Sequence, residues 1–159
     1  MSKEFDIGRS SEVWIVADFD AEVQAGQLEN SIDEYVSSIA ASYAKRYISA
    51  DLPVGVVAYG DNKYVLYADY GKVQLDRIME YFAIVKSNGS IPLENVISDF
   101  ERMWTYSTTV IIISSSASSS WVYAAFELMK KGVDVKVVQL DSLSFGARFT
   151  TLGNNHSST

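Results

Sequence analysis

Residues 54–67 read Val-Gly-Val-Val-Ala-Tyr-Gly-Asp-Asn-Lys-Tyr-Val-Leu-Tyr, and this stretch decides the fold. Val54–Tyr59 and Tyr64–Tyr67 are rich in β-branched and aromatic residues, which predicts two strands, and the residues between them have the composition of a turn. A parallel return between neighbouring strands needs a crossover of about a dozen residues or more. The short connection therefore predicts an antiparallel hairpin.

Strands and helices alternate on both sides of this hairpin. Val13–Ala17 and Thr109–Ile113 are continuous apolar runs, typical of strands buried on both faces of a sheet, and Val133–Leu140 alternates as a further strand. Helices are expected from Ser31, from about Gln74, across Leu93–Trp104 and across Val122–Met129. The order of elements predicts a three-layer, Rossmann-like α/β fold with a mostly parallel central sheet and one antiparallel edge strand. We expect the strand order 3-2-1-4-5, with Val13–Ala17 in the centre.

Composition indicates a single globular domain. The chain has 159 residues, of which 48% are hydrophobic and 21% charged, with two prolines and nine glycines, and these proportions are typical of an ordinary folded domain. Residues 1–12 are expected to form a lead-in and residues 13–141 the domain itself. Ser, Thr, Gly and Asn dominate beyond Asp141, so residues 142–159 are predicted to form a polar C-terminal tail.

Cysteine content, charge and hydropathy exclude several classes of function. The chain has no cysteine, so it has no disulfide framework, thiolate zinc site or thiol nucleophile. Thirteen basic against twenty acidic residues give a net charge of -7, which repels a nucleic-acid backbone. Val110–Ile113 is the longest aliphatic run and is far shorter than the ~20 residues of a membrane span, so no membrane contact is expected from this chain. His156 is the only histidine and lies in the predicted tail, where we expect no catalytic or zinc role.

The carboxyl ends of the parallel strands are where ligands bind in a sheet of this kind, at the point where the strand order reverses. This rule selects three segments: Asp18–Glu22 after the first strand, Ser114–Ser116 after the fourth, and Gly89-Ser90 before the third helix. The first segment carries carboxylates at three alternate positions, and carboxylates with serine hydroxyls are ligands for hard cations. Acidic residues and serines also form loops and helix caps readily, so the pattern alone leaves both interpretations open.

The first of these segments resembles the opening motif of the haloacid-dehalogenase superfamily, an apolar strand that ends in Asp-x-Asp. Val110–Ser114 is similar to the second motif of that superfamily, an apolar strand that ends in Ser or Thr. The resemblance implies a metal-dependent phosphatase in which Asp18 is the nucleophile, Asp20 the general acid–base and Ser114 a phosphate ligand. The phosphatase fold has no place for an antiparallel Tyr64–Tyr67 strand at the sheet edge, so topology tests this alternative.

A second resemblance covers nearly the whole chain from residue 3 to about residue 141. The stretches that carry it are, in order, Lys3–Ile7 leading into Val13–Asp18, Asp33–Val36, Ile39–Arg46, Pro53–Gly60, Leu75–Ile78, Ala83–Lys86, Gly89–Leu93 and Lys131–Val135. In this order they resemble the C-terminal half of the domain-of-unknown-function 58 family. The resemblance implies the fold of the von Willebrand factor A domain and a non-catalytic protein-interaction module, without enzyme activity and without a cofactor.

The family also implies a cellular context. Its members usually carry membrane-spanning helices and a β-rich region before this part, so the resemblance implies a cytoplasmic domain excised from a larger, membrane-anchored protein. Many members are encoded beside MoxR-type AAA+ ATPases. The implied partner is therefore such an ATPase, acting with the full-length protein in the assembly or maturation of other proteins.

The metal site of von Willebrand factor A domains is only partly preserved in this sequence. That site needs Asp-x-Ser-x-Ser after the first strand, a Thr before the third helix and an Asp after the fourth strand. Asp18 keeps the first position, whereas Asp20 and Glu22 replace the two serines, Ile91 aligns with the Thr, and Ser115 replaces the late Asp. The resemblance therefore implies a degenerate metal-ion-dependent adhesion site with no physiological metal.

An acidic, hydroxyl-rich rim is expected at the carboxyl ends of the strands. The residues that we expect to converge there are Asp18, Asp20, Glu22, Ser90 and Ser115. With a net charge of -7 on the chain, this rim should favour a basic or amide-rich protein surface and give salt-sensitive association.

Overall fold

A six-stranded sheet forms the centre of the computed structural model, which describes residues 11–19, 29–59, 63–85, 91–114, 119–141 and 146–151. Within these residues the strand order is β3-β2-β1-β4-β5-β6. β1 pairs in parallel with both β2 and β4, β4 pairs in parallel with β5, and β3 pairs antiparallel with β2. The strands are β1 (Glu12–Ala17), β2 (Val54–Tyr59), β3 (Lys63–Asp69), β4 (Thr108–Ser114), β5 (Asp134–Asp141) and β6 (Gly146–Thr151).

The predicted fold class and the predicted order of the first five strands are confirmed. β1 lies in the middle of the sheet, and β2 and β3 form the antiparallel hairpin at its edge. Every residue of β2 and β4 is buried. Strands covered by helices on both faces have apolar side chains in both directions, which explains why these stretches are unbroken apolar runs.

The sheet has one strand more than the sequence analysis expects. β6 pairs antiparallel with β5, from Asp141↔Gly146 to Lys136↔Thr151. It lies within residues 142–159, for which a polar tail is expected. The overall Ser, Thr, Gly and Asn content concealed the local sequence Ala-Arg-Phe-Thr-Thr, in which aromatic and β-branched residues favour a strand where a free sheet edge is available. The described sheet consequently carries an antiparallel strand at each edge.

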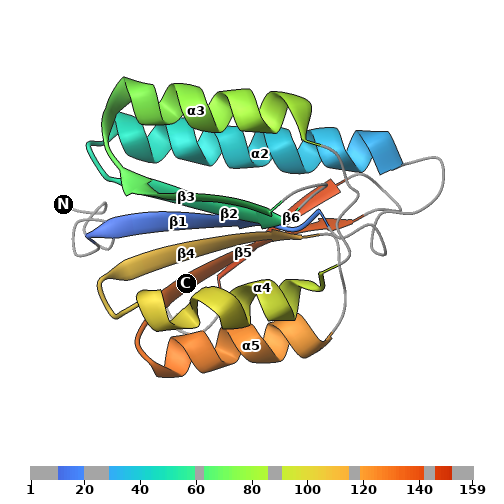
Figure 1. Ribbon diagram of the computed structural model, residues 1–159. Helices are drawn as coiled ribbons and strands as arrows, with labels where there is room; N and C mark the ends of the chain where they lie inside the picture. Colours follow the sequence, from blue (N-terminus) through green and yellow to red (C-terminus); the bar gives the residue numbers. More distant parts are fainter. Residues whose placement is uncertain are drawn as a thin grey trace.

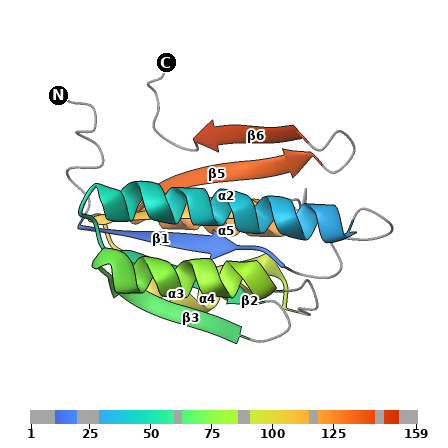
Figure 2. The same ribbon diagram turned by 90° about the horizontal axis from the view of Figure 1, so that it is seen from above.

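Helices cover both faces of the sheet (Figure 1). α2 (Glu29–Ser49) and α3 (Gly71–Ile84) pack on one face, and α4 (Leu93–Phe100) and α5 (Ser119–Lys130) pack on the other. We refer to these as the α2–α3 face and the α4–α5 face. Figure 2 shows α2 and α3 lying side by side along the strands. Among the described residues, no helix is both long and apolar enough to cross a lipid bilayer.

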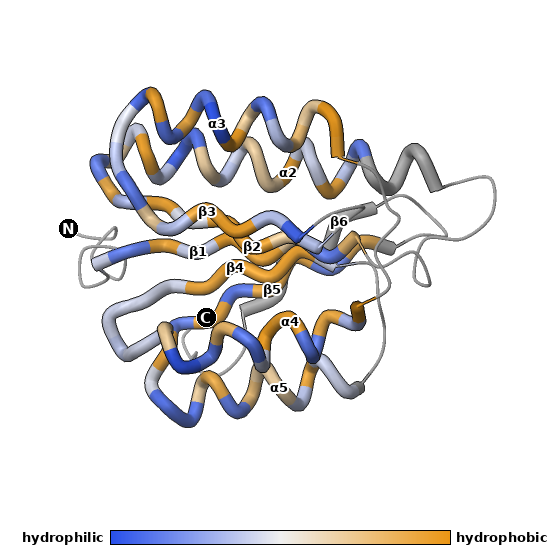
Figure 3. The backbone as a smooth tube through the Cα atoms, in the orientation of Figure 1, coloured by the Kyte–Doolittle hydropathy of each residue, from blue (hydrophilic) through white to orange (hydrophobic). Residues whose placement is uncertain are grey.

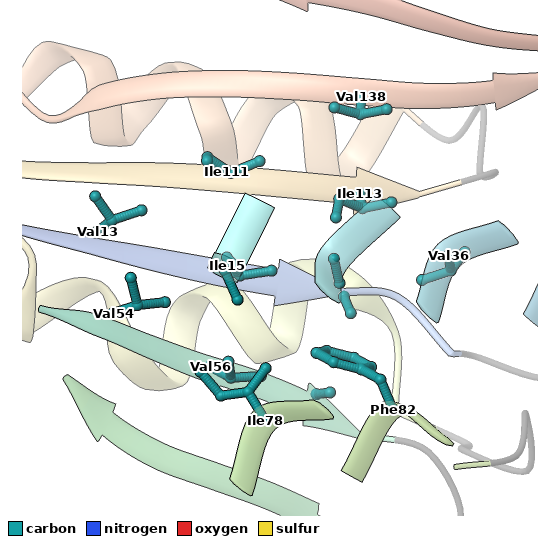
Figure 4. Close-up of a cluster of buried hydrophobic side chains, with 14 of the residues drawn as sticks. Val13, Ile15, Val36, Val54, Val56, Ile78, Phe82, Ile111, Ile113 and Val138 are labelled. Carbon is teal, nitrogen blue, oxygen red and sulfur yellow. The ribbon is translucent and has the colours of Figure 1, made fainter. Parts of the chain in front are cut away.

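Apolar side chains pack between the sheet and the helices on each face. Figure 3 shows hydrophobic residues concentrated in the central strands and recurring along the helices. On the α2–α3 face, Figure 4 shows valine and isoleucine side chains of β1, β2 and β4 packed together, with Ile78 and Phe82 of α3 beside them. On the α4–α5 face, the largest buried side chains are those of Trp14, Trp104 and Trp121. The central strand β1 is therefore covered by a hydrophobic cluster on each face of the sheet.

The start of α3 differs from its prediction. The helix begins at Gly71, whose φ of 88° lies in the left-handed region that favours glycine, and not at about Gln74. Gln74 lies inside the helix with 2% of its side chain exposed, and its amide donates to the carbonyl oxygens of Val54 at 2.7 Å and Tyr67 at 3.0 Å. The β2–β3 ladder is interrupted here by a bulge, so Gln74 supplies hydrogen bonds that the ladder lacks.

The third predicted helix, Leu93–Trp104, is shorter than expected. Pro92 caps α4, which ends at Phe100, and a 3-10 turn follows over Glu101–Met103. Trp104 then adopts an extended backbone with its side chain fully buried. The chain must leave the helix at this point because β4 begins only four residues later, at Thr108.

Candidate functional site

The carboxyl ends of β1 and β4 lie side by side at the centre of the sheet. The two strands pair in parallel up to Ala17↔Ile113, so the next residues, Asp18 and Ser114, lie opposite each other. The backbone N–H of Asp18 donates to the carbonyl oxygen of Ile113 at 3.0 Å. The Ser114 hydroxyl donates to Oδ2 of Asp18 at 2.7 Å. This pair joins the first and fourth strands where the sequence rule places a ligand site.

Both side chains of this pair are buried. Asp18 is 4% exposed and Ser114 is fully buried. A buried carboxylate is costly unless it is hydrogen-bonded, and a hydrogen bond to a charged group is worth about 1.5–3 kcal/mol. Phe19, the next residue, is also buried, and its ring centroid lies 6.3 Å from that of Phe82 on α3. The chain that leaves β1 is therefore anchored in the core, which fixes the position of Asp18.

The structure describes only one of the five residues assigned to the predicted rim. Asp18 lies at the carboxyl end of β1 as expected. The other four, Asp20, Glu22, Ser90 and Ser115, lie outside the described residues, so their convergence stays a prediction. The structure also brings Ser114 to Asp18. Ser114 belongs to the predicted Ser114–Ser116 segment and was assigned as a phosphate ligand in the phosphatase alternative, but it was not among the five rim residues.

A second polar contact at the same end of the sheet was not predicted. Because β1 and β2 pair up to Ala17↔Ala58, Tyr59 follows at the level of Asp18. The Tyr59 hydroxyl donates to Oδ2 of Asp99 on α4 at 3.3 Å, and the Lys63 ammonium lies 5.4 Å from the centre of the Tyr59 ring. Burial raises the pKa of the Tyr59 hydroxyl, and the negative charge of Asp99 and the hydrogen bond to it raise the pKa further.

The sequence indicates only part of this contact, namely that Tyr59 and Lys63 lie close together at the end of the β2–β3 hairpin. Tyr59 and Lys63 flank the predicted turn, but nothing in the sequence spacing links them to Asp99, forty residues after Tyr59. The contact depends on α4 crossing to the face of the sheet opposite α3. It therefore needed the three-dimensional structure.

The described residues at this end do not by themselves make up the metal site of a von Willebrand factor A domain. Ile91 stands at the position of the threonine ligand, and its side chain packs against the apolar core of the α4–α5 face, where it offers no oxygen. Over the described parts of the chain, no group of three or more His, Cys, Asp and Glu side chains comes together. Asp18 is left as the one described residue of the expected ligand set, and its Oδ2 already accepts the Ser114 hydroxyl.

The phosphatase alternative finds no support in the structure. β3 is antiparallel and lies at the edge of the sheet, where that fold has no place for such a strand. A nucleophilic carboxylate must also reach an incoming phosphate ester, whereas Asp18 is 4% exposed. Ser114, the proposed phosphate ligand, is fully buried and directs its hydroxyl to Asp18.

Comparisons with known proteins identify the fold. No family model and no curated protein matches the sequence. One crystal form of proximal thread matrix protein 1 from the mussel byssus is similar in structure, with a TM-score of 0.55, 14% identity and 82% of this chain covered. The manganese-loaded TRAP protein of Plasmodium vivax is similar with a TM-score of 0.53, 11% identity and the same coverage. The chain spans 38% of the length of the byssus protein and 57% of that of TRAP.

These similarities establish the fold and nothing finer. The structural neighbours include a von Willebrand A-like domain, so this chain has a von Willebrand A-like α/β fold. The fold part of the expectation drawn from the domain-of-unknown-function 58 resemblance is thereby confirmed. Membership in that family stays a prediction, because the sequence identities are too low to assign one.

Proposed function

We propose that this domain is a non-catalytic protein-interaction module with a degenerate metal site. The observation that carries the proposal is the von Willebrand A-like fold, whose domains are typically interaction modules, combined with a buried Asp18–Ser114 pair where the fold would place its metal. Asp18 and Ser114 are both buried, so neither side chain of this pair is open to a substrate. On this proposal the buried pair holds β1 and β4 together beneath a binding surface.

The partner and setting follow from the family resemblance. We propose that the chain is the C-terminal von Willebrand factor A-like domain of a domain-of-unknown-function 58 protein. On this proposal it is a cytoplasmic part of a membrane-anchored protein and acts with a MoxR-type AAA+ ATPase in protein assembly. The resemblance from residue 3 to about residue 141 supports this assignment.

The binding surface is the rim at the carboxyl ends of the strands. In the sequence, Asp20 and Glu22 come one and three residues after Phe19. Asp18 and Phe19 are both buried, so the chain that leads into this acidic segment is held at the end of β1. Asp99 on α4 adds a described carboxylate at the same end, beside Tyr59. The net charge of -7 adds a long-range attraction for a basic surface. The proposed partner surface is therefore basic or amide-rich.

A double charge removal tests the rim. Asp20→Asn with Glu22→Gln should weaken binding to a MoxR-type ATPase recovered with the full-length protein, and should flatten the dependence of that binding on salt. Asp76→Asn with Glu127→Gln is the matched control, because it removes the same charge from exposed ion pairs on α3 and α5. Binding by the rim variant with unchanged affinity and unchanged salt dependence would place the interface elsewhere.

A further inference from the structure

The outer edge of β3 pairs with no other described strand of the sheet. β3 pairs with β2 alone, and Figure 2 shows it at the border of the sheet. Every residue of β2 is buried, whereas every residue of β3 is partly or fully exposed. An edge strand of this kind offers backbone N–H and C=O groups to another strand.

One face of β3 carries an alternating row of a cation, an aliphatic side chain and an aromatic ring. Lys63 places its ammonium over the Tyr59 ring, Val65 packs against the core of the α4–α5 face, and the Tyr67 ring stands edge-on to Trp14 with centroids 6.0 Å apart. All three side chains therefore lie on the α4–α5 face of the strand. Tyr67 is 63% exposed although it is large and mostly apolar.

This row is complementary to itself when two copies meet in antiparallel orientation. With a two-fold axis at Val65, Lys63 of one copy lies opposite Tyr67 of the other, and residues that are directly opposite in an antiparallel pair share a face. An ammonium group placed at an aromatic ring gains a cation–π interaction, here twice because of the symmetry. The stretch that pairs ends where the bulge begins, since β3 inserts its extra residue at Tyr67–Ala68 opposite Gly55.

The charge around this edge also favours a second copy. Between residues 63 and 77 the chain carries three basic residues (Lys63, Lys72 and Arg77) and two acidic ones (Asp69 and Asp76), whereas the whole chain has a net charge of -7. Lys63 forms no ion pair with any other described residue, in contrast to Lys72, which pairs with Asp76 at 3.1 Å. This stretch therefore does not share the net negative charge by which two copies repel each other.

We propose that two copies of this domain associate through β3, antiparallel about Val65, to form one sheet that is continuous across both. This surface runs along the edge of the sheet and adjoins, at Lys63 and Tyr59, the rim to which the proposed function assigns the partner protein. Few residues pair before the bulge, so the association is weak and reversible and becomes visible between high micromolar and millimolar concentrations.

Sedimentation velocity over this concentration range tests the proposal. The average mass of the wild-type chain should rise from 17.6 kDa towards twice that value. Tyr67→Lys places a lysine opposite Lys63 of the second copy and should weaken association roughly tenfold or more. Adding Lys63→Glu to Tyr67→Lys restores opposite charges across the axis and should restore association. Tyr106→Lys, at a tyrosine that is 83% exposed elsewhere on the surface, is the control and should associate like the wild type.

Several outcomes would overturn the proposal. A wild-type chain that stays monomeric at millimolar concentration excludes it, as does a Tyr67→Lys variant that associates like the wild type. Failure of the double variant to restore association excludes the antiparallel register about Val65. Circular dichroism monitors folding, and Lys63→Glu alone, at an exposed position, provides a second weakening variant that leaves the core untouched. Asp20→Asn with Glu22→Gln should leave self-association unchanged, which separates this edge from the rim.

Discussion

The α2–α3 face and the α4–α5 face of the sheet are covered by helices of different lengths. α2 and α3 have 21 and 14 residues, whereas α4 and α5 have 8 and 12. All three tryptophans of the chain lie on the side of the shorter helices, where Trp14 packs so closely over Gly55 that a Cβ there would lie 2.9 Å from its ring. Large rings thus fill the volume that short helices leave open. The two faces are therefore filled by side chains of different size.

Truncating a tryptophan should produce the largest loss of stability, because it removes one of the large rings that fill the α4–α5 face. Trp14→Ala removes a side chain that is 1% exposed and that contacts Phe100 and Trp104, so we expect the free energy of unfolding to fall by about 3–5 kcal/mol. Urea denaturation followed by circular dichroism measures the loss. Val13→Ala, on the opposite face of the same strand, is the matched control and should cost clearly less, because fewer buried atoms are lost. Equal losses would show that the α4–α5 face does not depend specially on its rings.

Alkaline pH should weaken the α2–α3 face more than the α4–α5 face. Burial raises the pKa of Tyr43, Tyr47 and Tyr64 on the α2–α3 face, and it also raises the pKa of Tyr59 on the other face. Above pH of about 10, tyrosines of the unfolded chain lose protons that the folded chain retains. The stabilisation is therefore complete below that pH and is lost as pH rises through the raised pKa values of the folded state.

A single variant isolates this effect. Tyr47→Phe should reduce the steepness with which the free energy of unfolding falls at alkaline pH, because the Tyr47 ring is 4% exposed and its hydroxyl can no longer ionise. Urea denaturation at a series of pH values around and above 10 measures the slope. Tyr106→Phe, at an exposed residue, is the control. A slope that Tyr47→Phe leaves unchanged would contradict the assignment to this face.

Divalent cations should have the smallest effect on stability. Their candidate site is at Asp18, at the end of the central strand between the two faces. An ion at a hundredfold its dissociation constant would add about 2.7 kcal/mol, which is roughly 5 to 10 °C in melting temperature for a domain of this size. We expect millimolar magnesium or manganese to shift the melting temperature by less than about 2 °C relative to chelator. A larger, saturable rise that Asp18→Asn abolishes would show that the carboxylates do form a metal site.

The sequence predicted the arrangement of strands because the relevant signals are local. The short turn between Val54–Tyr59 and Tyr64–Tyr67 permits only a hairpin, and the doubly buried strands are unbroken apolar runs. β6 was missed because its strand character depends on the edge of β5, a partner that no local pattern displays. The burial of Gln74 was missed for a similar reason, since a polar side chain is buried there only because a bulge leaves carbonyl oxygens to be bonded.

The candidate site also has features that the sequence predicts and features that it does not. The position of Asp18 follows from the rule that parallel strands end together, and the sequence places it correctly. Its hydrogen bond with Ser114 and the contact between Tyr59 and Asp99 depend on rotamers and on helix placement. Sequence spacing carries no information about either, so the sequence could name the end of the sheet but not the contacts made there.

The hydrogen bonds between Ser11 and Ser107 fix the place at which the chain enters the sheet. The backbone N–H of Ser11 donates to the carbonyl oxygen of Ser107 at 2.6 Å, and the two hydroxyls lie 3.1 Å apart, so the chain is pinned immediately before β1. Ser11 and Asp18 stand at opposite ends of that strand, about 23 Å apart at the usual rise per residue. The first described residue and the carboxyl ends of β1 and β4 therefore lie at opposite ends of the sheet, so a partner bound at the rim approaches the domain from the end remote from Ser11.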